Sequence, residues 1–133
     1  INMSNKMDKI LAEISAGELF DKITILEIKR AKISDKEKLN NIEKELSSLN
    51  ETVKNFIPDQ SKISKHINDL KNINLKLWDI EDKKRAAEKN KDFNEKFIEL
   101  ARNVYKFNDE RAKIKLLINT ELGSNIKEVK SYE

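Results

Sequence analysis

The apolar residues between positions 93 and 123 follow one another at alternating steps of three and four, which predicts one face of an α-helix. This stripe consists of Phe93, Phe97, Leu100, Val104, Phe107, Ile114 and Ile118. Arg111 stands where the next apolar residue is expected. Because an unpaired charge is costly to bury, this position predicts a carboxylate or carbonyl partner for Arg111. Asp92 is the predicted N-cap of this helix, and Gly123 predicts its C-terminal end.

Three more helices precede this one, and local signals mark their ends. The four predicted helices cover residues 16–32, 35–56, 61–89 and 93–122. Ser15 and Glu18 have the spacing of a capping box, and Ser34 and Glu37 repeat it, so a helix is expected to begin after each serine. Pro58 ends the second helix, because proline disfavours helical backbone in the residue before it.

Together these elements predict an all-α fold, an antiparallel four-helix bundle with a long coiled-coil-like helical hairpin. We expect a single helical domain over residues 1–133, with residues 1–14 and 124–133 as arms. Counting from the two hairpin turns predicts four pairs: Leu46 near Leu70, Leu49 near Ile67, Asn74 near Asn108, and Glu81 near Arg102. The first helix is apolar on several sides, which is typical of a central helix or of one shared in a homodimer.

Composition narrows the class of protein. Hydrophobic and charged residues each make up 38% of the 133-residue chain, and only two glycines and one proline occur, which fits amphipathic helices better than a sheet. The absence of cysteine excludes disulfides, thiolate nucleophiles and cysteine-ligated metals. The net charge of +3 is spread evenly, so no concentrated basic patch predicts nucleic-acid binding. No apolar run is long enough to span a membrane, and we expect a cytoplasmic protein.

Polar residues on otherwise apolar helix faces are the first candidates for function. This set consists of Arg30, Asn74, Glu81, Asn108 and Arg111. One interpretation is that these side chains satisfy one another and fix the register of the helices. The alternative is a polar pocket in which the two arginines bind an anionic ligand.

Carboxylates at a spacing of three residues are the second candidates. Glu18 with Asp21, and Asp79 with Asp82, would each lie on one helix face and could hold Mg²⁺ with a nucleotide phosphate. In a chain this rich in charge, such pairs also arise by chance on a solvated face. No other cofactor is predicted, and the single His66 completes no metal site.

Three segments, in the same order along the chain, resemble an uncharacterised family of small bacterial all-helical proteins. They are GELFDKITILEIK from Gly17, LWDIED from Leu77, and residues 97–123 followed by Lys130-Ser131-Tyr132. The family has no assigned activity, so the resemblance supplies no catalytic residues. It implies that the three segments meet in space and form a shared polar cluster. The cluster's residues are Glu18, Asp21, Lys22, Trp78, Asp79, Glu81, Asp82, Arg102, Asn108, Asp109 and Arg111.

The sequence therefore favours a protein of unknown function that acts as a non-enzymatic helical interaction or assembly module. We expect a homodimer, with a further protein partner as its target. The alternative is a helical-bundle enzyme or binding domain for an anionic metabolite or nucleotide, acting with Mg²⁺. A pocket joining Glu18, Asp21, Glu81 and Arg111 would favour this alternative, whereas separate ion pairs would favour the module.

Overall fold

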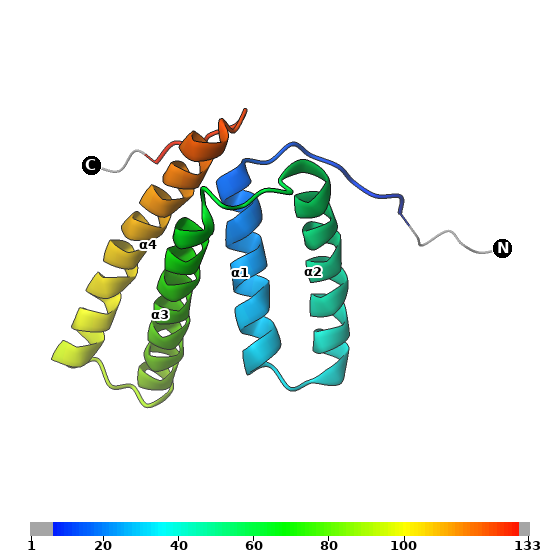
Figure 1. Cartoon of the computed structure of the whole chain (residues 1–133). Coiled ribbons are helices and arrows are strands. Elements are labelled where there is room, and N and C mark those ends of the chain that lie inside the picture. Colours follow the sequence, from blue (N-terminus) through cyan, green and yellow to red (C-terminus); the bar gives the residue numbers. More distant parts are fainter. Residues whose placement is uncertain (1–6, 131–133) are drawn as a thin grey trace.

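A computed structural model of the chain describes residues 7–130, so the Ser131 and Tyr132 of the closing motif lie outside the described residues. It has four helices, and the predicted all-α bundle is confirmed: α1 (Ala16–Lys32), α2 (Lys36–Phe56), α3 (Ser64–Lys89) and α4 (Glu95–Leu122). Along the chain the helices alternate in direction (Figure 1). None of the described helices is long and apolar enough to cross a membrane.

Side-chain caps mark where the helices begin. Ser15 accepts a hydrogen bond from the backbone N–H of Glu18, as its capping signal predicted. The cap of α2 lies one residue later than the predicted Ser34, because Asp35 accepts the hydrogen bond from the backbone N–H of Glu37. The expected cap of α4 at Asp92 is wrong. Asn94 takes this role and accepts hydrogen bonds from the backbone N–H groups of Lys96 and Phe97.

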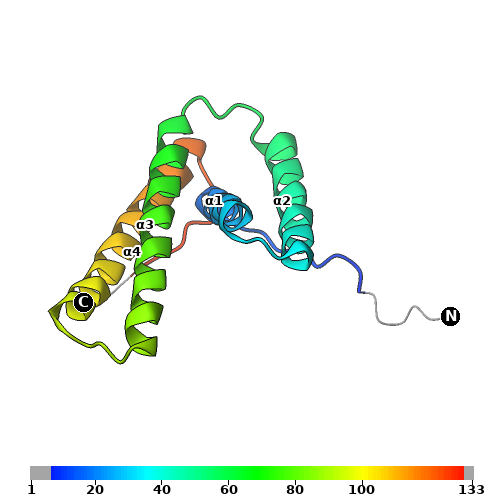
Figure 2. The ribbon, with the colours of Figure 1, turned by 90° about the horizontal axis from the view of Figure 1, so that it is seen from below.

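The helix α1 is the central element of the bundle. It contacts α2, α3 and α4, whereas α2 contacts no helix other than α1. Figures 1 and 2 both show α1 between α2 on one side and the α3–α4 hairpin on the other. This position explains why α1 is apolar on several sides, because Leu19, Phe20 and Ile28 are all buried within one chain. The apolar character of α1 is therefore no longer an argument for a dimer.

The predicted packing of α2 against α3 is wrong. We expected the Pro58 turn to fold α3 back onto α2, with Leu46 near Leu70 and Leu49 near Ile67. Instead the two helices make no contact, because α1 lies between them. Leu46 and Leu70 are both buried, and they belong to one core that α1 completes. The α3–α4 hairpin forms as expected, since these two helices pack along each other.

A close approach of α1 to α4 requires the glycine at position 17. A Cβ atom placed there would lie 2.5 Å from the carbonyl oxygen of Lys115 and 3.0 Å from Oδ1 of Asn119. The Gly17 backbone N–H instead donates to that Asn119 oxygen at 2.6 Å. This contact fixes the N-terminus of α1 against the last turns of α4. The other glycine, Gly123, ends α4 in the left-handed conformation at φ 63°, as predicted.

Candidate functional site

The Asp21 carboxylate is the point at which three helices are joined by polar contacts. Its side chain, on α1, is only 1% exposed. Oδ1 accepts hydrogen bonds from Nδ2 of Asn74 on α3, at 3.0 Å, and from Nε of Arg111 on α4, at 2.9 Å. Nη2 of Arg111 donates to Oδ2, which makes the pair bidentate. The hydrogen bonds that Arg111 donates to Asp21 raise the pKa of Arg111 above its usual value, so the guanidinium stays protonated.

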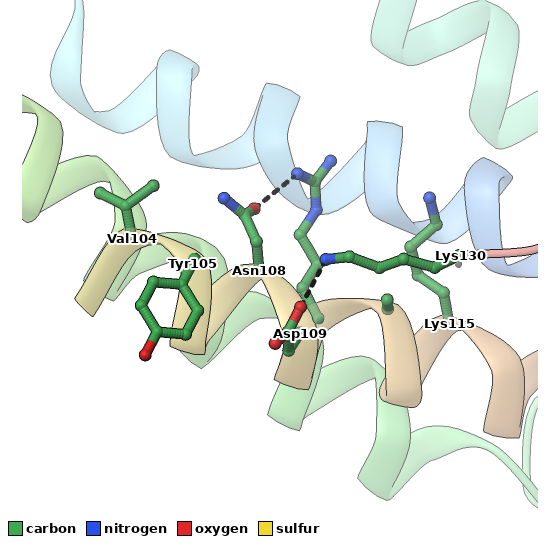
Figure 3. Close-up of a pocket in the computed structure, with 8 residues that line it drawn as sticks. Val104, Tyr105, Asn108, Asp109, Lys115 and Lys130 are labelled. Atoms are coloured by element: carbon green, nitrogen blue, oxygen red, sulfur yellow. Dashed lines mark hydrogen bonds and ion pairs between the residues drawn. The ribbon is translucent and has the colours of Figure 1, made fainter. Parts of the chain in front are cut away.

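Thr24 and Asn108 complete this polar junction. The Thr24 hydroxyl is fully buried; it donates to the backbone carbonyl of Asp21 and accepts from Nδ2 of Asn74. Nη1 of Arg111 donates to Oδ1 of Asn108 at 3.4 Å, one turn away on α4 (Figure 3). No buried side-chain nitrogen or oxygen among the described residues lacks a hydrogen-bond partner. The junction is therefore a satisfied buried network of the kind that fixes helix register.

A second polar group lies one turn nearer the N-terminus of α1. Glu18 forms an ion pair with Nζ of Lys115 on α4 at 2.7 Å, and a longer one with Lys22 at 3.9 Å. Lys115 also reaches Glu128 at 3.7 Å, in the segment after α4. In the same region Lys130 extends back along α4 to Asp109, at 2.7 Å (Figure 3). These contacts bind α1 and the last described residues to α4.

A groove opens beside the junction where α1, α3 and α4 meet, and we call it the α1–α3–α4 groove. Its apolar lining is formed by Ile25, Ile28, Leu77, Trp78 and Val104. Its polar lining is formed by Asn74, Glu81, Asp82, Arg85, Asn108 and Arg111. The volume of the groove is about 510 Å³. A second hollow, of about 790 Å³, adjoins it on α4 and shares Val104, Asn108 and Arg111 with it (Figure 3).

The structure brings part of the predicted polar cluster together. Five of its members line the groove: Trp78, Glu81, Asp82, Asn108 and Arg111. The buried Asp21 accepts hydrogen bonds from Arg111. The other members lie in neighbouring contacts or on other surfaces. Glu18, Lys22 and Asp109 belong to the ion pairs just described; Asp79 lines a hollow between α3 and α4, and Arg102 lies on the outer face of α4.

One prediction about these residues is wrong. Arg30 was expected inside the core, but its side chain is 46% exposed, and its Nη1 lies 3.6 Å from Oε1 of Glu43 on α2. Arginine can keep its charged end in solvent while its methylene groups cover apolar surface, and this explains the error. Glu81 forms an ion pair with Lys84 on its own helix, at 3.5 Å, and its expected proximity to Arg102 stays a prediction. By contrast, Asn74 and Asn108 both line the groove, as their predicted proximity requires.

Sequence reasoning missed Thr24, Asn119 and Lys115 as members of these networks. Thr24 carries no signal beyond its place one turn after Asp21. Lys115 and Asn119 lie one and two turns beyond Arg111 on the same α4 face, at a spacing of four. This polar continuation of the stripe from Arg111 was the available signal. Within residues 7–130, no group of three or more histidine, cysteine or acidic side chains is placed to hold a metal ion.

Comparison with known proteins gives a family for the chain. Residues 10–133 match a family of unknown function, DUF6165. The chain belongs to this family. No curated protein and no solved structure was found to match it. The family match covers all four helices and every residue of the groove, and the small all-helical character expected from the sequence agrees with it.

Proposed function

We propose that this DUF6165 domain is a non-enzymatic interaction module that receives an amphipathic segment of a protein partner in the α1–α3–α4 groove. The setting we expect is the cytoplasm of a bacterial cell. The observation that carries the proposal is that three acidic side chains of the predicted cluster are already engaged in ion pairs. Asp21, Glu18 and Glu81 each form an ion pair with a basic residue, with Arg111, Lys115 and Lys84 respectively.

Such pairing favours a structural role for these carboxylates over a catalytic one. An acid–base group needs a free position for substrate and a pKa matched to proton transfer. The Asp21 carboxylate is 1% exposed and accepts from both Arg111 and Asn74, which leaves no oxygen directed at a substrate. The polar residues of the site thus hold the three helices together, and the surface they support is the functional feature.

The lining of the groove supports a peptide segment as its occupant. Helix-binding grooves present apolar side chains to the anchors of the incoming helix and charged side chains at their edges. Here Ile25, Leu77 and Val104 provide apolar lining from three helices, and Asp82 and Arg85 are exposed at the edge on α3. Trp78, a residue type enriched at binding hot spots, lies among them.

A photo-crosslinking amino acid placed at Asp82 would test this proposal in living cells. Asp82 is exposed at the edge of the groove, so the substitution leaves the core intact. We expect a discrete crosslinked protein adduct from this position, and loss of the adduct when Trp78→Ala is added. Glu45, an exposed acid on α2, is the matched control position. Equal crosslinking from both positions, or none from either, would contradict the proposal.

A second candidate, a small anionic ligand in the same groove, is favoured by Arg85. Within residues 7–130, Arg85 has no ion-pair partner, and it shares the groove with Arg111 and Trp78. Two guanidinium groups beside an indole could bind a nucleotide or a dicarboxylate, with or without Mg²⁺. A ligand at about 100 times its Kd stabilises a native protein by about 2.7 kcal/mol.

Thermal denaturation with nucleotides, sugar nucleotides and dicarboxylates, each with and without Mg²⁺, separates the two candidates. A Tm that rises with ligand concentration, and that no longer rises in Arg85→Ala, would support the small ligand. An unchanged Tm across the series would remove this candidate and leave the interaction module.

A further inference from the structure

The segment before α1 exposes four large apolar side chains. Residues 7–14 have no regular secondary structure and lead away from Ser15 past α2 (Figures 1 and 2). Met7, Ile10 and Leu11 are 80%, 79% and 87% exposed, and Ile14 is 40% exposed. None of them belongs to the hydrophobic core. We call this segment the N-terminal arm.

The spacing of these four residues is that of a helix face. Positions 7, 10, 11 and 14 are separated by three, one and three residues, so in a helix all four would lie on one stripe. Asp8 and Glu13 would flank this stripe on opposite sides, and Lys9 would lie on the far face. Large apolar side chains gain free energy on leaving water, so such a stripe favours docking on an apolar surface.

We propose that the N-terminal arm folds as an amphipathic helix in the α1–α3–α4 groove of a second copy of the chain. This inference rests on the proposed function, since it names the segment that the groove receives. The exchange is reciprocal, with each copy donating one arm and receiving the other, which gives a two-fold symmetric dimer. The anchors follow the i, i+3, i+4, i+7 pattern by which helices bind in grooves.

Chain length argues that the arm docks on another copy rather than on its own. A helix of eight residues is about 12 Å long. In α1 the groove is lined by Ile25 and Ile28. These residues stand ten and thirteen positions after Ser15, which corresponds to helix rises of about 15 and about 20 Å. A helical arm hinged at Ser15 is therefore too short to lie along its own groove. The arm also leaves the bundle on the side of α2, away from the α3–α4 hairpin that forms the groove (Figure 2).

The charges of the groove and of the N-terminal arm also support docking of the arm in the groove. Arg111 is already neutralised by Asp21, and Glu81 is paired with Lys84. Of the two arginines that line the groove, Arg85 lies at its edge and forms no ion pair within the described part of the chain. In the arm helix, Asp8 and Glu13 lie on opposite sides of the apolar stripe. Whichever way the arm helix runs along the groove, one of these two acids therefore faces the edge at Arg85. The apolar lining of the groove and its cationic edge thus both match the arm.

Cross-linking between two differently labelled chains tests the docking directly. The chain contains no cysteine, so introduced thiols are the only reactive ones. One preparation carries Asp8→Cys and the other Asp82→Cys, and a bismaleimide cross-linker is added to the mixture. We expect cross-linked dimers of the two chains at several times the yield obtained when Glu45→Cys on α2 replaces Asp82→Cys. Equal yields would overturn the proposal.

Sedimentation equilibrium of the full chain gives an independent test. We expect a monomer–dimer equilibrium whose Kd rises about tenfold or more in Leu11→Asp, because a charge then enters the apolar stripe. Lys9→Ala, on the far face of the arm helix, should leave the Kd unchanged. A chain that stays monomeric throughout, or a dimer indifferent to Leu11→Asp, would overturn the proposal.

The proposed function and the arm inference can fail separately. If Leu11→Asp has no effect but crosslinking from Asp82 still gives an adduct with another protein, the arm inference fails and the interaction module stands. If Leu11→Asp abolishes the dimer but Trp78→Ala, confirmed as folded by circular dichroism, leaves it intact, the arm docks outside the groove and the arm inference fails. The proposed function is then decided by crosslinking from Asp82.

Discussion

At the scale of single residues, the bidentate pair between Asp21 and Arg111 determines how α1 meets α4. The sequence predicted that Arg111 needs a carboxylate, and this need is met. It could not identify Asp21 as that carboxylate. Hairpin counting relates α3 to α4, its neighbour in the chain, but gives no register between α4 and the distant α1. The partner of Arg111 therefore depends on how α1 packs against α4, which the spacing of apolar residues within each helix does not specify.

Replacing Arg111 by leucine should lower the free energy of unfolding by about 3 kcal/mol, because the buried Asp21 charge loses its partner. Adding Asp21→Asn removes that charge, so the double variant should lose less than the sum of the two single variants. Urea denaturation of the four proteins gives the coupling. With Glu81→Gln in place of Asp21→Asn the effects should add, and strong coupling there would contradict the observed pairing.

Gly17→Ala should destabilise the protein by about 1–3 kcal/mol, although alanine is the better helix former. The cost arises because the added methyl group would lie 2.5 Å from the Lys115 carbonyl oxygen, which is backbone and cannot rotate away. The matched control is Gly123, where nothing lies within 4 Å of an added Cβ and only the positive φ is unfavourable. Asparagine, which tolerates that φ, should be accepted at 123 and rejected at 17. Equal Tm losses for asparagine at both positions would contradict the packing argument.

At the scale of helices, an apolar stripe predicts that part of a helix face is buried, but it does not predict what covers that face. In the stripe predicted along α4, Ile118 is buried but Phe93 is 52% exposed. In α2, Ile42, Leu46 and Val53 recur at steps of four and seven residues, and all three are buried. Their cover is α1 and not α3. A hydrophobic period shows that a face is buried, but every apolar helix offers a similar surface. The choice between α1 and α3 depends on the path of the whole chain.

Since α2 contacts a single helix, it should open before the rest of the bundle. Native-state hydrogen exchange should show lower protection for the amides around Leu46 than for those around Leu70 of α3, which is packed by both α1 and α4. Leu46→Ala should increase the exchange of α2 amides while leaving α3 amides largely unchanged. Equal protection of both helices would mean that they unfold as one unit.

The N-terminus of α4 gives a test of capping at the level of an element. Asn94→Ala should cost about 1 kcal/mol of unfolding free energy, because the backbone N–H groups of Lys96 and Phe97 lose their acceptor. Asp92→Ala should have little effect, since Asp92 lies in the loop before the cap. The sequence placed the cap at Asp92 because both residues are good caps, and only the backbone path between Lys89 and Glu95 distinguishes them. A larger loss of stability for Asp92→Ala would reverse this assignment.

At the scale of the whole molecule, the residues just before α1 and just after α4 contact each other at the N-terminus of α1. Ser124 accepts a hydrogen bond from the backbone N–H of Ala16 at 3.1 Å, and the Ser15 hydroxyl donates to Glu128 at 2.7 Å. Asn125 donates to Glu13, in the N-terminal arm, at 2.6 Å. The sequence suggested only an arm without periodicity after Gly123, because isolated side-chain contacts leave no repeating pattern. These contacts place the base of the N-terminal arm against the end of α4.

A chain that ends at Gly123 should therefore lose about 1–2 kcal/mol of unfolding free energy, as a cap acceptor and partly exposed ion pairs disappear together. Hydrogen exchange should increase in the first turn of α1, where the Ala16 N–H loses its acceptor, and remain unchanged at the distant α3–α4 turn. Ser124→Ala alone should reproduce the increase at Ala16, whereas Ser47→Ala, on the exposed face of α2, should not. If truncation raised exchange evenly over all four helices, the last segment would act on global stability and not as a local clamp. An increase confined to α1 would show that residues 124–130 hold the helix on which the Asp21 junction, the groove and the N-terminal arm all depend.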